Sequence, residues 1–166
     1  MGQLLIKQKV FSIRDKFDIY DENQNVKYRV ESSLFSLKYK LTVYDTYGNE
    51  LGVITQKVFT LMPKYDVEIN GNYIGQIKQK FTFFKPKYEV DYNGWSVEGN
   101  IMGWNYSVNK GFNLIASIKQ KIISWGDTYV IDFINQEDEL MILMLVLAID
   151  ATNRSQAAAS SASVSS

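Results

Sequence analysis

The sequence contains no cysteine and no histidine among its 166 residues. Without cysteine the chain can form neither a disulfide nor a thiolate metal site. Without histidine it lacks the commonest general base and the commonest metal ligand of proteins. We therefore expect a protein that is not an enzyme and that carries no metal and no cofactor.

An excess of charge of one sign is also lacking, because eighteen basic residues balance eighteen acidic ones. No whole-chain field draws the protein to nucleic acid, and we expect no nucleic-acid partner. The basic excess lies in residues 1–126 and an acidic excess in residues 127–166, which leaves a bipolar surface open. The tryptophans Trp95, Trp104 and Trp125 are interpreted as core and cross-strand packing residues rather than stacking platforms for bases.

Long hydrophobic runs are scarce. The opening MGQLLIKQKV lacks the apolar core of a secretory signal, so the expected location is cytoplasmic. The run LMILMLVLAI, residues 140–149, is apolar on every side but much shorter than the about 20 residues that span a bilayer. It predicts a helix buried on all sides, with Asn135 and the acidic residues 137–139 at its start. The small polar stretch 151–166 is expected to be a disordered Ala/Ser tail.

The tetrapeptide IKQK occurs at residues 6–9, 77–80 and 118–121, and ITQK occurs at 54–57. Eleven residues after each Ile comes an aromatic residue, namely Phe17, Tyr65, Tyr88 or Tyr129, which opens an alternating apolar and polar segment. Such alternation is typical of half-buried strands. Weaker copies start at Val30 and Ile101, so the chain holds six units of two strands, with IKQK expected to begin the first strand of each unit.

Turn residues agree with this count. The pairs Asn70-Gly71, Asn93-Gly94 and Lys110-Gly111 lie between alternating runs, as tight hairpins require. Strands are predicted near 4–13, 16–21, 26–32, 37–45, 50–60, 64–70, 73–83, 87–92, 95–102, 104–109, 112–124 and 128–134. Twelve strands enclose more space than their own side chains fill, and the apolar helix supplies the missing volume. The predicted fold is an all-β, twelve-stranded closed antiparallel barrel around a buried C-terminal helix, formed by residues 1–150.

With its IKQK-like openings at Ile6, Ile54 and Ile77 and its terminal LMILMLVLAI, the chain resembles the LURP-one-related family of the tubby C-terminal-like superfamily over residues 3–150. The superfamily includes the phospholipid scramblases. The resemblance implies a twelve-stranded barrel around the helix and, from tubby-like domains, binding of phosphoinositide headgroups and tethering to membranes. The chain departs from scramblases in having no palmitoylated cysteine cluster, and no binding residue is transferred from the family.

Lysines are the candidate ligand-binding residues. Odd-numbered strands run in one direction, so lysines of the repeats are expected near one rim, where a collar could attract phosphate or an anionic membrane. A second group flanks the prolines Pro63 and Pro86 in two loops. The candidates are Lys64, Lys85, Lys87, Lys7, Lys9, Lys78, Lys80, Lys119 and Lys121, with Lys57 as a further member of the collar. The alternative interpretation is that they are ordinary outward residues of half-buried strands.

Other polar groups have structural interpretations. The repeat glutamines, Gln8, Gln56, Gln79 and Gln120, fall on the apolar side, where each amide is expected to find backbone partners at a bulge or loop. The carboxylates Asp15 and Asp18, or the triplet 137–139, are the only candidates for a hydrolase.

Two function hypotheses follow. In the first, the barrel binds or tethers to anionic phospholipid headgroups, peripherally at the inner membrane surface. In the second, it is a soluble protein-interaction or stress-related scaffold without lipid affinity.

Overall fold

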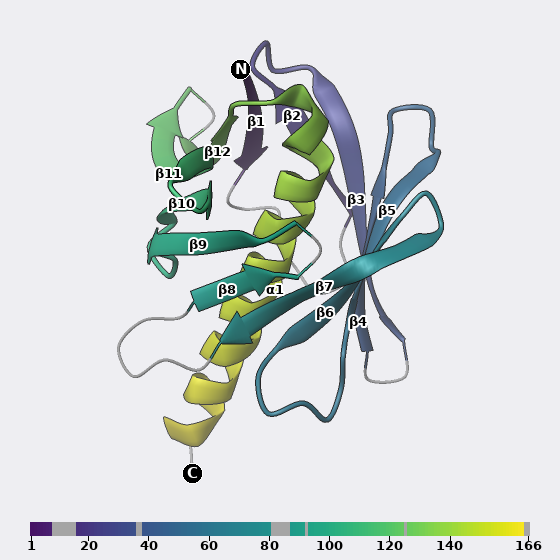
Figure 1. Ribbon diagram of the computed structural model, residues 1–166, viewed down its shortest axis with the longest axis vertical. Coiled ribbons are helices and arrows are strands. Elements are labelled where there is room, and N and C mark those ends of the chain that lie inside the picture. The colour runs from purple at the N-terminus through teal and green to yellow at the C-terminus, as the bar shows by residue number, and fades with distance from the viewer. Residues whose placement is uncertain (8–15, 36–37, 81–86, 92, 125, 165–166) are drawn as a thin grey trace.

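The computed structural model is a closed barrel of twelve antiparallel strands around one long helix (Figure 1). The structure describes residues 1–7, 16–35, 38–80, 87–91, 93–124 and 126–164. Each strand pairs with its neighbours in the sequence, and β1 pairs with β12 to close the barrel. The predicted fold class is confirmed.

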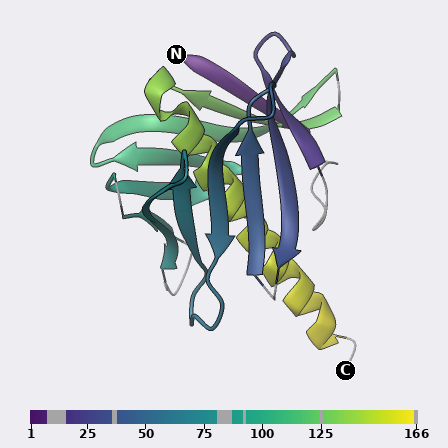
Figure 2. The same ribbon diagram turned by 90° about the vertical axis from the view of Figure 1, so that its right-hand side faces the viewer.

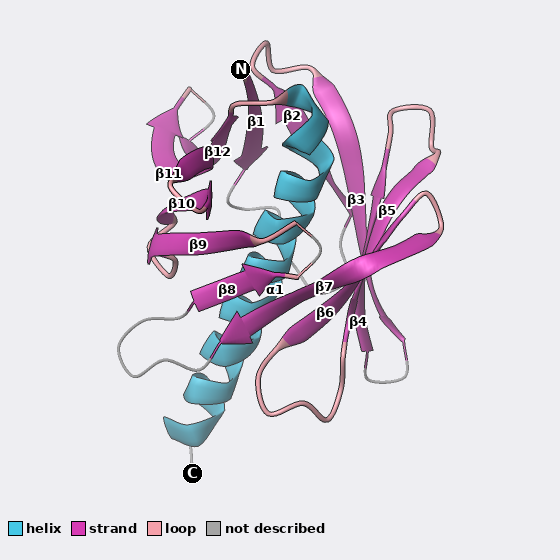
Figure 3. Ribbon diagram, viewed as in Figure 1, coloured by secondary structure: helices cyan, strands magenta, loops and turns pink. Residues whose placement is uncertain are grey.

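The twelve strands occupy the predicted places. Their bounds are β1 Gly2–Lys7, β2 Lys16–Asp21, β3 Val26–Phe35, β4 Lys38–Tyr44, β5 Glu50–Gln56, β6 Lys64–Ile69, β7 Asn72–Lys80, β8 Lys87–Val90, β9 Trp95–Asn100, β10 Asn105–Lys110, β11 Asn113–Ile123 and β12 Gly126–Phe133. Figure 3 distinguishes these strands from the loops and the single long helix.

The turn predicted at Asn70-Gly71 is confirmed, and it shows where strand β7 begins. Asn70 and Gly71 have φ values of 50° and 75°, the left-handed pair that a two-residue hairpin demands. Strand β7 therefore starts directly after Gly71, several residues before its IKQK tetrapeptide. Lys7 is the last residue of β1 and Lys80 the last residue of β7. The prediction that IKQK begins a strand is thus wrong, because the hairpin lies upstream of it.

The helix fills the barrel as predicted. A 3-10 turn, η2 (Gln136–Asp138), leads into α1 (Glu139–Val164). Residues 142–151 of the helix are buried, since the inner faces of the strands surround them. The acidic residues 137–139 lie at the helix start, but Asn135 makes no side-chain capping hydrogen bond to the 3-10 turn. Figure 2 shows the helix crossing the interior and projecting beyond the strands at its C-terminal end.

The helix is longer than the apolar run that predicts it. It continues to Val164 through the segment expected to be a disordered tail. Two features explain the extension. Ala151 and Thr152 are still buried inside the barrel, and alanine, which recurs over the following turns, has the highest helix propensity.

The barrel has two distinct rims. Glu139, at the helix start, contacts Lys27 and Tyr28 at the beginning of β3, so the helix enters at the end that carries the hairpins β2–β3, β4–β5 and β6–β7. Gln156 donates to Gln79 near the end of β7, so the helix leaves at the opposite end, where residues 57–63 and 101–104 connect strands. We call these the entry rim and the exit rim.

Candidate functional site

The repeat corresponds to a fixed cross-strand register. Gln56 lies directly opposite Tyr65, Gln79 opposite Tyr88, and Gln120 opposite Tyr129. Residues directly opposite share one face of a sheet. The chain segment between each Ile and its aromatic residue therefore contains the end of one strand, the connection at the exit rim and the start of the next strand.

Aromatic side chains from all six even-numbered strands form a belt around the helix. The belt consists of Phe17, Tyr39, Tyr65, Tyr88, Tyr106 and Tyr129, of which Tyr39 is half-buried and the others are buried. The spacing of the repeat predicts four of them, whereas Tyr39 and Tyr106 do not follow an IKQK-like tetrapeptide. A signal was present for Tyr39, because a Lys-aromatic dipeptide opens β2, β4, β6 and β8 alike.

The belt surrounds a polar stretch of the helix. The Tyr65 hydroxyl lies 2.9 Å from Oγ1 of Thr152, and burial raises the pKa of Tyr65 to about 12. The hydroxyls of Tyr88 and Tyr106 are buried, and neither has a hydrogen-bond partner within the part of the chain that the structure describes. Burial also raises the pKa of the Asp150 carboxyl to about 6, against the opposing effect of Arg154, whose Nε lies 2.6 Å from Asp150 Oδ2. The hydrogen bond of Tyr65 stabilises the fold, whereas the unpaired hydroxyls and the buried carboxyl destabilise it. All of these groups face away from solvent, so they do not form a binding site.

The repeat glutamines divide by position. Gln79 is buried, and its Oε1 accepts a hydrogen bond of 3.2 Å from Nε2 of Gln156, so its side-chain partner is the helix rather than the predicted backbone bulge. Gln56 is half-buried and Gln120 is exposed. Gln8 lies outside the described residues.

Two of the candidate hydrolase carboxylates have basic partners. Asp18 forms a long, exposed ion pair of 3.7 Å with Arg29. Glu139 is buried at the helix start, where it accepts hydrogen bonds from the Tyr28 hydroxyl (2.7 Å) and from Lys27 Nζ (2.8 Å). Asp15 lies outside the described residues.

Several candidate lysines near the exit rim have partners. Lys57 pairs with Asp66 at 2.9 Å and Lys78 with Asp91 at 2.8 Å, and Lys80 pairs with Glu89. The Nζ of Lys7 lies 5.0 Å from the centre of the Tyr20 ring, within the range of a cation–π contact. Carboxylates or rings on neighbouring strands thus already neutralise or cover part of the predicted collar.

Four candidate lysines have no ion-pair partner among the described residues. They are Lys64, Lys87, Lys119 and Lys121. Lys64 and Lys87 open β6 and β8, on either side of β7, whereas Lys119 and Lys121 belong to β11. Lys9 and Lys85 fall outside the described residues, so the predicted loop group is described only through Lys64 and Lys87.

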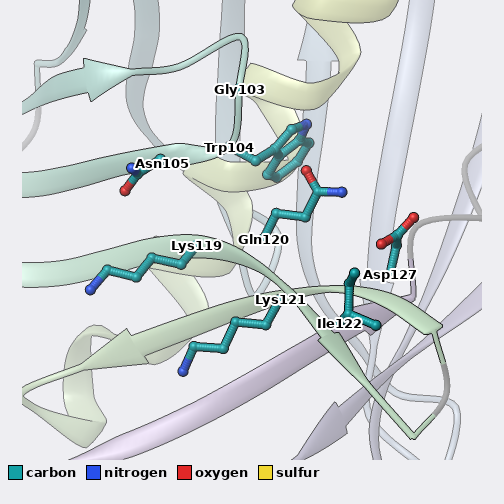
Figure 4. Close-up of a pocket in the computed structure, with 8 residues that line it drawn as sticks. All are labelled: Gly103, Trp104, Asn105, Lys119, Gln120, Lys121, Ile122 and Asp127. Atoms are coloured by element: carbon teal, nitrogen blue, oxygen red, sulfur yellow. The ribbon is translucent and has the colours of Figure 1, made fainter.

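Lys119 and Lys121 line a pocket of about 680 Å³ beside β10, β11 and β12. Its lining residues are Gly103, Trp104, Asn105, Lys119, Gln120, Lys121, Ile122 and Asp127. Figure 4 shows the two lysine side chains extending in the same direction from β11, while Gln120 extends the opposite way toward Trp104. Asp127 lies on the far side of the strand from the two ammonium groups (Figure 4). The pocket therefore presents two exposed cations that its own carboxylate leaves uncompensated.

The pocket has a fixed aromatic wall. Trp104 stacks on Tyr129 with a centroid separation of 3.7 Å and an interplanar angle of 9°. Trp104 adopts a φ of 51°, and its carbonyl accepts a hydrogen bond of 2.9 Å from the backbone N–H of Gln120. This combination holds the turn 101–104 against β11. The prediction that Trp95 and Trp104 pack in the core is confirmed, and Trp125 lies outside the described residues.

The two rims carry opposite charge among the described residues. The strand ends at the exit rim hold Lys7, Lys16, Lys38, Lys40, Lys57, Lys64, Lys78, Lys80, Lys87 and Lys121, with Asp18, Glu31, Asp66, Glu89, Glu98 and Asp127 as the acidic residues. The entry rim holds Asp21, Glu22, Asp45, Glu50, Glu68, Asp132, Glu137, Asp138 and Glu139, with Lys27 and Lys110 as the basic ones. This polarity along the barrel axis is not the one suggested by the split at residue 126, because entry-rim acids such as Asp21, Asp45 and Glu68 come from the segment with the basic excess.

Within the described part of the chain, no helix combines the length and the apolar character needed to cross a membrane.

Comparison with known proteins identifies the family. The family model described as LURP-one-related matches residues 3–150. The uncharacterized protein YxjI of Bacillus subtilis (strain 168) is 33% identical over 150 residues, which cover 90% of this chain and 93% of that protein. An X-ray structure of an Arabidopsis thaliana protein is similar with a TM-score of 0.62 and 17% identity, over 90% of each chain, and this likeness shows the shared fold. The chain belongs to the LURP-one-related family.

Proposed function

We propose that the protein binds anionic phospholipid headgroups at the pocket beside β11, peripherally at the inner membrane surface, and that it acts by binding rather than by catalysis. The observation that carries the proposal is the pair Lys119 and Lys121, which project together into solvent without a carboxylate partner among the described residues. Residues two apart on a strand lie about 7 Å from each other, so two ammonium groups can reach one headgroup.

One further pocket group can contact a phosphate on the lysine side of β11. Asn105 lies directly opposite Lys119, and its side-chain amide can donate a hydrogen bond to the same headgroup, whereas Gln120 and Trp104 lie on the other side of the strand. Each lysine near an anionic membrane surface contributes about 1 kcal/mol of attraction, which falls with added salt. The basic character of the whole exit rim supports the same orientation toward negative charge.

Co-sedimentation with liposomes tests the proposal. Phosphatidylcholine vesicles with graded phosphatidylserine are mixed with the protein at low and at physiological salt. Binding should increase with the anionic fraction and weaken with salt. The double variant Lys119→Gln/Lys121→Gln should lose roughly thirtyfold in affinity, since two contributions of about 1 kcal/mol disappear.

The matched control is Lys110→Gln, which removes an exposed lysine at the entry rim and should leave binding unchanged. Equal binding by the double variant and the parent would refute this pocket as the site. Absence of sedimentation at both salt concentrations would refute lipid binding and favour a protein-interaction barrel instead.

A further inference from the structure

The connection between β5 and β6, residues 57–63, presents two bare apolar side chains at the exit rim. Phe59 and Leu61 are each 99% exposed. Val58, Thr60 and Met62 are half-buried, so the loop alternates between residues that face the barrel and residues that face solvent. Exposed apolar groups that polar residues surround mark interaction surfaces. We propose that this loop inserts into the interfacial layer of an anionic bilayer and turns the exit rim toward the membrane. The inference rests on the proposed function and adds an orientation to it.

The loop holds its apolar side chains in place. At its base, the N–H of Lys57 donates to the carbonyl of Lys64 (2.8 Å), and the N–H of Gln79 donates to the carbonyl of Pro63 (3.0 Å). Phe59 has a φ of 59°, a left-handed conformation that is costly for a bulky residue. A backbone that retains Phe59 in this conformation keeps the ring outside the barrel, where it contributes nothing to the core.

Positive charge surrounds the base of the loop. Lys64 lies directly opposite Lys78, and Lys80 lies directly opposite Lys87. Like charges in opposite positions of a sheet repel each other. Asp91 and Glu89 neutralise Lys78 and Lys80. Lys64 and Lys87 have no such partner among the described residues, and an anionic headgroup layer would supply one.

Charge also selects which rim meets the membrane. The exit rim carries further exposed apolar side chains at Leu34, Met102 and Ile122. The entry rim also exposes apolar rings, at Tyr47 and Phe112. Its acidic residues would repel an anionic surface, whereas the lysines of the exit rim attract it. Exposed apolar side chains next to basic residues are the arrangement that binds the surface of an anionic membrane.

The absence of native cysteine makes the orientation directly measurable. Leu61→Cys and Phe112→Cys each create a single labelling site, one on each rim, for an environment-sensitive nitrobenzoxadiazole dye. With phosphatidylserine-containing vesicles, the dye at residue 61 should shift to the blue and brighten, and spin-labelled lipid should quench it. The dye at residue 112 should keep its aqueous emission in the same samples.

The outcomes separate this inference from the proposed function. Sedimentation of the labelled protein without a change at residue 61, or with the change at residue 112, overturns the orientation and leaves headgroup binding in place. Failure to sediment overturns both.

A second measurement uses Phe59→Ser/Leu61→Ser. This variant should lose about tenfold or more in vesicle affinity and retain its affinity for water-soluble glycerophosphoserine. Tyr47→Ser is the matched control at the entry rim. Equal loss for both ligands, or no loss of vesicle affinity, contradicts the insertion.

Discussion

The hydroxyl of Tyr65 donates a hydrogen bond of 2.9 Å to Oγ1 of Thr152 and thereby joins strand β6 to the helix inside the barrel. The direction follows from the neighbouring contact, because Thr152 donates its own hydroxyl proton to the carbonyl of Ala148 (3.0 Å). Tyr106 lies in the same belt, one even-numbered strand beyond Tyr88 and two beyond Tyr65, and its buried hydroxyl has no partner among the described residues. The belt thus contains one tyrosine whose hydroxyl is hydrogen-bonded and another whose hydroxyl is not.

Phenylalanine substitutions at these two positions should have different effects. Tyr65→Phe removes a buried hydrogen bond and should lower the free energy of unfolding by about 1 kcal/mol. Tyr106→Phe removes a hydroxyl that loses its hydration on folding and gains no partner, so stability should stay level or rise. Urea denaturation measures both. A larger loss for Tyr106→Phe than for Tyr65→Phe would contradict the predicted order.

Asp150 should make the protein less stable as the pH rises toward neutrality. Burial raises its pKa in the folded state from 3.8 to about 6. Between these two values the folded state binds a proton that the unfolded state has released, so stability falls as the pH rises through this window. The change amounts to roughly 2 kcal/mol. Thermal unfolding between pH 4 and pH 7 measures it.

Asp150→Asn is the test of this assignment. The amide oxygen can still accept the hydrogen bond from Arg154 Nε, and the variant should flatten the pH dependence and raise the melting temperature at pH 7. Asp45 provides a contrast, because its hydrogen bonds to Asn49 lower its pKa and its contribution to stability is lost only as the pH falls below 3.8. An unchanged slope between pH 4 and pH 7 in Asp150→Asn would refute the role of this carboxyl.

Two glycines of the barrel should differ in their tolerance of alanine. A Cβ at Gly99 would lie 2.8 Å from the carbonyl oxygen of Asn105 and 2.9 Å from Cα of Tyr106, and Gly99 has a φ of +124°. Backbone atoms cannot move aside without breaking the β9–β10 pairing, so Gly99→Ala should cost roughly 2 kcal/mol or more.

At Gly52 the closest atoms are Sδ and Cε of Met144, at 2.7 and 2.9 Å. Methionine is flexible, and Gly52→Ala should cost less than about 1.5 kcal/mol. Chemical denaturation of the two variants gives the comparison. A greater loss at Gly52 would show that Met144 has no room to adjust.

The helix should tolerate a stop codon at one position and not at another. A chain ending at Gln156 keeps the buried residues 142–151, the Thr152 contact and the Gln79 contact, and should lose less than about 1 kcal/mol. A chain ending at Ile149 removes Asp150, Ala151 and Thr152 from the interior and should fail to give a cooperative unfolding transition. Similar melting temperatures for both chains would contradict the packing of this segment.

The strands could be predicted because each has one face in the core and one in solvent, which gives an alternation of apolar and polar residues in the sequence. Alternation such as that of residues 65–70 places one face in the core, and Asn70-Gly71 marks the hairpin that follows. Helix length was less predictable. The residues after 150 are small and polar, and neither an apolar stripe nor a capping residue marks their helix.

Neutralisation of particular lysines could not be predicted from periodicity. Lys78 and Lys119 belong to the same IKQK tetrapeptide, yet only Lys78 has a carboxylate, Asp91, within reach. Lys78 lies opposite Glu89 but pairs with Asp91, two positions further along the chain. The equivalent position for Lys119, which lies opposite Val130, is Asp132, and that carboxylate accepts a hydrogen bond from Gln3. The repeat predicts where the lysines lie on their strands. Whether a lysine is free to bind a ligand depends on the residues of the neighbouring strands, which differ from copy to copy.

The order of elements along the chain bears on how the barrel folds. Closure pairs β1 with β12, so that Gln3 meets Asp132 across 129 positions of sequence, and the helix that fills the interior follows both strands. Loop-closure entropy makes such distant pairing slow. During synthesis the strands emerge in sequence without the apolar segment that covers their inner faces. The barrel therefore completes its core only after residues 142–151 have left the ribosome, and until then its inward-facing tyrosines and isoleucines depend on transient collapse or on chaperones for protection from aggregation.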